Sequence, residues 1–143
     1  MHEDTKQLLA DCTAGIDMAL SNLDGMLPNA KDHTLRQKLQ DSIRSHHQLR
    51  QQTVELLHRV GGEEKAPSLM AKSMAWLKNN TRLTLKNDDT TVASLVTDGC
   101  DMGIKSLCRS RNRYAAADPD AKLLAEQLID CDEKLSASMR PYL

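Results

Sequence analysis

The sequence predicts an all-α four-helix bundle made of two antiparallel helical hairpins that repeat one another. Four segments show apolar residues at steps of three and four, which is the period of an amphipathic helix and not of a strand. Short links join the helices within each pair, and a longer link joins the pairs. Shifting the chain by 84 residues (97 − 13 = 84) superposes identical residues: Thr13, Gly15, Asp17, Met18 and Leu23 on Thr97, Gly99, Asp101, Met102 and Leu107. Such a repeat is typical of a fold built twice from one unit.

The composition is that of one domain covering residues 1–143, with an almost purely aliphatic core. The chain has no Phe and only one Trp, and its 143 residues suffice for a core without disulfides or metal. Nineteen basic and twenty acidic side chains nearly cancel, which argues against nucleic acid as a partner. We find no apolar run long enough to cross a membrane and no secretory signal, so we expect a cytoplasmic protein without a membrane partner.

The four cysteines have no Cys-x-x-Cys spacing, which argues against zinc modules and thioredoxin-like chemistry. We expect reduced and mostly buried thiols. Cys108 lies outside the apolar seam of its helix, and it is therefore the thiol that we expect to be reactive.

The first hairpin is predicted over about residues 4–60. Asp4 or Thr5 can cap its first helix, which Pro28 ends. The second helix runs from about Asp32 to Val60 and is followed by Gly61, a typical left-handed C-terminal signal. The inward positions of the first helix are Leu9, Cys12, Ile16, Ala19, Leu23 and Met26. Those of the second are Leu35, Leu39, Ser42, His46, Leu49, Thr53, Leu56 and Val60.

A crossover of about residues 63–86 follows, with Leu69, Met70, Met74, Trp76 and Leu77 at helical spacing. We expect a short helix there, joining opposite ends of the bundle as in bundles with one long connection. Trp76 is expected to pack this segment against the bundle.

The second hairpin is predicted over about residues 88–140. Its first helix has an acidic start at Asp88 and Asp89, and its second has Asp118 as cap and Pro119 in the first turn. The inward positions are Val96, Cys100, Gly103, Leu107, Ser110 and Tyr114 in one helix. In the other they are Leu124, Leu128, Cys131, Leu135 and Tyr142.

Several short motifs give the chain a resemblance to a known family. They are Gly15 midway along the first helix, Gly99 at the matching place in the third, residues 59–63 (Arg-Val-Gly-Gly-Glu) and residues 74–78 (Met-Ala-Trp-Leu-Lys). With these the chain resembles the bacterial ferritin-like domains of unknown function, which are related in fold to ferritins and rubrerythrins. The resemblance implies a ferritin-like four-helix bundle.

Catalytic ferritin-like proteins hold two irons with carboxylates from two helices and a Glu-x-x-His pair from each of the other two. If Gly15 and Gly99 mark the level of the metal centre, the carboxylates of the first and third helices would directly follow them. Ile16 and Cys100 occupy those two positions. The matching levels, residues 41–45 and 130–134, contain no Glu-x-x-His. Asp41, Asp130 and Glu133 are weak candidates that supply only part of a metal site. We therefore expect no cofactor and a dry middle layer, formed by Ile16, Cys100, Cys131 and either Ser42 or Ile43.

Two alternatives remain open at this point. Glu55 and His58 form a literal Glu-x-x-His that could hold iron or another divalent metal at a displaced site, although charged residues at a bundle end explain them as well. His47 with Leu49 and Arg50 fits a fragment of the histidine phosphotransfer domains, with Arg50 able to balance phosphate charge. Gln51 departs from that pattern, because those domains carry a glycine there.

The repeated Met18 and Met102 fall on the outer side of their helices, beside Gly15 and Gly99. Apolar side chains on an outer face, next to glycines that permit close approach, indicate a second packing surface. We expect a homodimer through the first and third helices, and a non-enzymatic protein that works by binding or scaffolding.

Overall fold

A computed structural model describes residues 2–64 and 88–143, and within them every regular element is helical. The elements in chain order are α1 (His2–Met26), η1 (Leu27–Asn29), α2 (His33–Arg59), α5 (Asp89–Arg113), α6 (Pro119–Met139) and η2 (Arg140–Tyr142). The predicted all-α class is thus confirmed. The crossover helix and the packing of Trp76 were predicted for a segment that lies outside the described residues.

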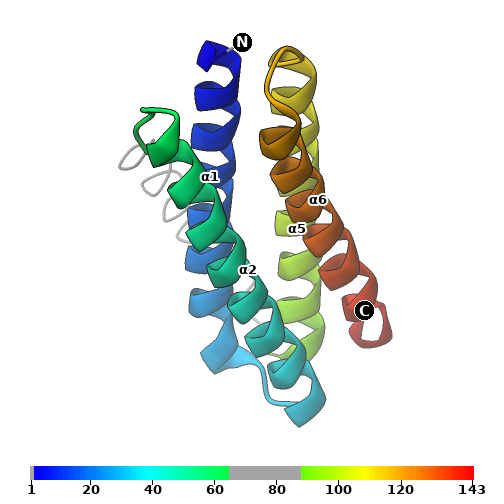
Figure 1. Cartoon of the computed structure of the whole chain (residues 1–143). Helices are drawn as coiled ribbons and strands as arrows, with labels where there is room; N and C mark the ends of the chain where they lie inside the picture. Colours follow the sequence, from blue (N-terminus) through cyan, green and yellow to red (C-terminus); the bar gives the residue numbers. More distant parts are fainter. Residues whose placement is uncertain (1, 65–87) are drawn as a thin grey trace.

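The four long helices form two antiparallel hairpins that pack side by side (Figure 1). α1 packs against α2 and α5 packs against α6, while α1 also contacts α5 and α2 contacts α6. In the view of Figure 1, α2 and α6 lie in front of α1 and α5. The bundle therefore presents two broad faces, one formed by α2 and α6 and the other by α1 and α5.

Helix ends follow local sequence signals in most cases. Asp32 caps α2 by accepting a hydrogen bond from Leu35 N, and Asp88 caps α5 by accepting one from Thr91 N. Gly61, just after α2, has a φ of 75°, as its place in the C-terminal signal predicted. Asp118 precedes α6, but its side chain makes no capping bond.

The predicted cap of α1 was wrong, because this helix already begins at His2. Asp4 instead accepts a hydrogen bond from Ala116 N, and Thr5 Oγ1 accepts one from Asp118 N, at 3.1 and 2.8 Å. These polar groups are used to fix the turn between α5 and α6. At the opposite end, Asp89 accepts hydrogen bonds from Lys31 N and Asp32 N, at 2.7 and 3.0 Å.

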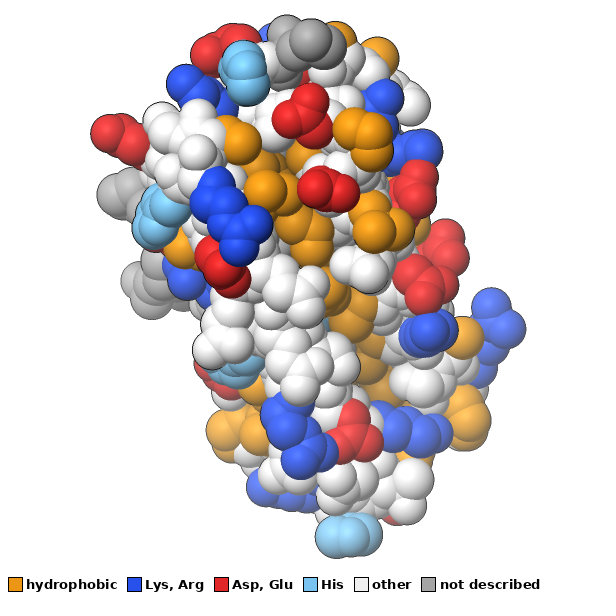
Figure 2. Space-filling model, viewed as in Figure 1, with side chains coloured by type: hydrophobic (Ala, Val, Ile, Leu, Met, Phe, Trp, Pro, Cys, Tyr) orange, Lys and Arg blue, Asp and Glu red, His pale blue; other side chains and the backbone are white. Residues whose placement is uncertain are grey.

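The core is aliphatic, as the composition predicted, and it forms two clusters along the bundle. Most predicted inward positions are buried, although α2 buries Leu57 completely while Leu56 is only half-buried. Figure 2 shows hydrophobic side chains along the seam between α2 and α6, with acidic and basic side chains mixed on both sides. No described helix is long and apolar enough to cross a membrane.

Candidate functional site

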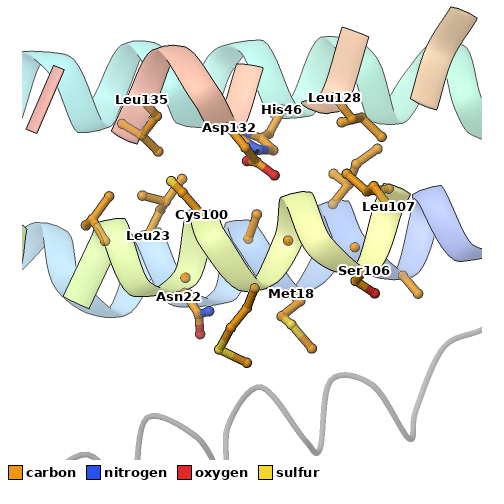
Figure 3. A pocket seen from close by; sticks show the side chains of 18 of the residues that line it. Met18, Asn22, Leu23, His46, Cys100, Ser106, Leu107, Leu128, Asp132 and Leu135 are labelled. Atoms are coloured by element: carbon orange, nitrogen blue, oxygen red, sulfur yellow. Dashed lines mark ion pairs between the residues drawn. The ribbon is translucent and has the colours of Figure 1, made fainter. Parts of the chain in front are cut away.

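A cavity of about 290 Å³ opens between α1 and α5 and extends into the middle of the bundle. Figure 3 shows that the two helices form its walls and that His46 of α2 and Asp132 of α6 lie at its floor. Most of its lining is apolar, and three glycines face it from α1 and α5. Its main lining residues are Gly15, Ile16, Met18, Asn22, Leu23, Met26, Leu95, Val96, Gly99, Cys100, Met102, Gly103, Leu107, Leu128 and Leu135.

The floor carries a buried ion pair. His46 Nε2 lies 3.4 Å from Asp132 Oδ1, and the two side chains are 1% and 10% exposed. The other ring nitrogen of His46, Nδ1, donates to the Ser42 carbonyl at 2.8 Å and lies 3.8 Å from Cys131 Sγ. Both nitrogens of the imidazole therefore have acceptors, which favours the doubly protonated ring.

The pKa of His46 reflects a competition between burial and these neighbours. Burial lowers the pKa, because it penalises the charged ring. The hydrogen bond to Asp132 raises it, as do Cys131 and the Ser42 carbonyl, and the net effect is an increase from 6.5 to about 10. At neutral pH the floor of the cavity is thus an imidazolium paired with a carboxylate.

The predicted dry middle layer was therefore wrong in composition. Ile16 and Cys100 are buried there as expected, but Cys131 is only half-buried and the neighbouring Asp132 is buried in its place. Asp132 follows Leu128 by four residues and precedes Leu135 by three, so it occupies the inward position of α6. That spacing was visible in the sequence, and it could have indicated Asp132 as the partner of the inward His46.

The absence of a side chain at Gly103 leaves room for the carboxylate of Asp132. A Cβ atom at Gly103 would lie 2.7 Å from Asp132 Oδ2, which is too close for a side chain held by its partner His46. The sequence placed Gly103 on the inward side of its helix, but not opposite a carboxylate.

Gly15 and Gly99 have no such steric reason to be glycines. A Cβ at Gly15 would lie 3.8 Å from Leu107, and one at Gly99 would lie 3.9 Å from Asn22, which are ordinary contacts. Each glycine inside a helix costs roughly 1 kcal/mol relative to alanine. Packing against the described residues does not explain these two glycines, and both face the cavity.

The weak metal candidates of the sequence do not converge. Asp41, Asp130 and Glu133 are all exposed, with Asp41 paired to Arg44 and Asp130 paired to Lys134. Among the described residues, no three His, Cys, Asp or Glu side chains are placed to hold a metal ion.

The two alternative motifs lie on the surface of α2. Glu55 and His58 are exposed, and Glu55 bonds to Arg59 at 2.7 Å. His47 is exposed as well, but Arg50 is already engaged by Asp17 at 2.7 Å and by Glu64 at 2.5 Å. Arg50 is therefore not free to balance a phosphate on His47.

The cysteines match the expectation in part, since two of the four are buried and Cys131 is half-buried. Cys12 and Cys100 are buried, and burial raises the pKa of both thiols, that of Cys12 to about 12. Cys108 is exposed, and its reactivity stays a prediction. The buried thiols behave as small hydrophobic groups.

The expected interface residues all line the cavity: Gly15, Met18, Gly99 and Met102. Met102 is 47% exposed, which is unusual for a large apolar side chain, and Met18 is half-buried. The structure thus brings the four residues together on one surface, formed by α1 and α5.

The helix order and packing define a ferritin-like four-helix bundle, with a histidine–aspartate pair at its middle level. The solved structure of Dps92 from Deinococcus radiodurans is similar, with a TM-score of 0.76 over 99% of this chain and 87% of that one. The two sequences are 16% identical, so the likeness concerns the fold. The sequence matches no known family profile and no curated protein.

Proposed function

We propose that this protein is a ferritin-like bundle that works by binding and not by catalysis, without a di-iron centre. We place it in the cytoplasm, in the group of bacterial ferritin-like domains of unknown function that its sequence resembles. The proposal rests on one observation: among the described residues, the middle level of the bundle holds one imidazole, His46, and one carboxylate, Asp132, paired with each other.

The chemistry of iron oxidation supports this reading. A di-iron centre needs several inward carboxylates and two imidazoles on facing helices. Here the facing positions are the apolar Ile16 and the thiol Cys100, and the carboxylate of Asp132 is occupied by His46. Hard cations prefer oxygen donors, and the described side chains of this layer supply too few of them.

Iron loading tests the proposal directly. After aerobic incubation with excess Fe²⁺ and desalting, we expect far less than one iron per chain by mass spectrometry. We also expect oxidation no faster than in protein-free buffer. Two irons per chain in the wild type, lost in Asp132→Asn but kept in Asp130→Asn, would overturn the proposal.

We further propose that the binding surface, formed by α1 and α5 around Met18 and Met102, joins two copies of the chain. Its support is the exposure of Met102, a large apolar side chain that is 47% exposed on α5. We expect sedimentation of a dimer at micromolar concentration, and of a monomer for Met102→Glu.

A matched control for this test lies on α6. Leu123 is 52% exposed and does not line the cavity, so Leu123→Glu should leave the dimer intact. A wild-type protein that sediments only as a monomer would contradict the dimer, without affecting the prediction for iron.

A further inference from the structure

We propose that the cavity between α1 and α5 binds a small aliphatic molecule that carries one hydrogen-bond donor, with the donor directed at Asp132 Oδ2. This inference deepens the proposed binding function and rests on it. It concerns the interior of the cavity, whereas the proposed dimer contact concerns the rim around Met18 and Met102.

The size and lining of the cavity specify the body of the ligand. About 290 Å³ is near the lower end of the range for small-molecule sites. Deep walls of Leu23, Leu107, Leu128 and Leu135 would contact an aliphatic chain without leaving a polar group unpaired. A charged or strongly polar body would lose its hydration there without compensation.

Asp132 specifies the head group. Its Oδ1 is paired with His46 Nε2 at 3.4 Å. No other described residue donates a hydrogen bond to its Oδ2. Asp132 is 7% exposed as a residue and lines the cavity, so a ligand in the cavity would meet this carboxylate with little competing water. A buried carboxylate oxygen gains from a donor, such as a hydroxyl or an amine, and repels an anion.

Three glycines that line the cavity leave space beside this carboxylate. Gly103 lies directly beside Asp132 Oδ2, and any side chain there would displace the oxygen. Gly15 and Gly99 face the same cavity, and the nearest described side-chain atoms would lie 3.8 and 3.9 Å from their added Cβ atoms. Side chains at these three positions would narrow the cavity, which gives the glycines a common role as the space for a ligand.

The probes are three unbranched molecules: 1-octanol and octyl methyl ether, which share an octyl chain, and octanoate, whose eighth carbon is that of the carboxylate. Protein with ¹³C-labelled methionine methyl groups reports binding, since Met18, Met26 and Met102 line the cavity whereas Met139 does not. We expect 1-octanol to shift the first three signals and to leave Met139 unchanged. The ether and octanoate should bind at least tenfold more weakly, because neither offers a donor at neutral pH.

Two leucine substitutions in α5 provide the matched variants. Gly99→Leu places a side chain inside the cavity and should weaken octanol binding at least tenfold. Lys105→Leu adds the same side chain at an exposed position that does not line the cavity, and it should leave binding unchanged. Circular dichroism of both variants checks that each is folded.

Three results would overturn the inference. The first is the absence of methionine shifts at the solubility limit of 1-octanol. The second is equal affinity for the alcohol and the ether, and the third is unchanged binding in a folded Gly99→Leu protein. None of them bears on iron loading, so failure of this inference is distinguishable from failure of the proposed function.

Discussion

Asp132→Ala is expected to lower the free energy of unfolding by about 3–5 kcal/mol at neutral pH, because it removes one partner of a buried ion pair. His46, which is 1% exposed, would be left without its carboxylate in the middle of the bundle. Urea unfolding followed by circular dichroism measures the change. Asp130→Ala is the matched control, since Asp130 is exposed and pairs with the exposed Lys134, and it should change stability by less than about 0.5 kcal/mol.

A double-mutant cycle separates the ion pair from simple loss of packing. His46→Leu combined with Asp132→Ala removes both charges, and it should cost less than the sum of the two single changes. Replacing a whole buried ion pair with apolar groups is often nearly neutral, whereas breaking it is not. Additive single effects would show that His46 and Asp132 are not coupled.

Stability is expected to fall as the pH rises above neutrality, because of His46. The folded-state pKa of this group is raised from 6.5 to about 10, so protonated His46 favours the folded state. This contribution is fully present below pH 6.5 and is lost as the pH rises through about 10. Urea unfolding at a series of pH values should therefore show a decline for the wild type across this window.

His46→Gln provides the control for this pH dependence, because other groups also titrate at alkaline pH. The difference in stability between the wild type and His46→Gln should shrink as the pH rises. NMR titration of the imidazole gives an independent measurement. An imidazole that titrates at or below pH 6.5 would contradict the ion pair with Asp132.

The fold could be predicted from the sequence because its signals are local and repeated. Apolar residues at steps of three and four indicated the helices, and Asp32, Asp88 and Gly61 marked helix ends that the structure confirms. Asp4 and Thr5 misled the prediction because they bond to residues 112 and 113 positions away in the sequence. A single sequence gives no sign of such a distant partner.

The candidate site was only half predicted. His46 was placed inward, and Cys100 and Ile16 were correctly placed at the middle level. Asp132 was missed because the sequence analysis placed the adjacent Cys131 inward, since a buried thiol costs less free energy than a buried carboxylate. The burial of Asp132 depends on a partner from another helix and on the space beside Gly103, and neither is a property of α6 itself.

The hydrogen bonds at the two ends of the bundle relate its two hairpins by symmetry. Under the repeat of 84 residues, Thr5 corresponds to Asp89 (89 − 5 = 84) and Asp32 to Ala116 (116 − 32 = 84). Side chains in the first turn of each hairpin thus accept hydrogen bonds from backbone N–H groups in the loop of the other hairpin. Each hairpin therefore contributes acceptor side chains from its first turn and backbone N–H donors from its loop, which makes the contact between the two hairpins approximately two-fold symmetric.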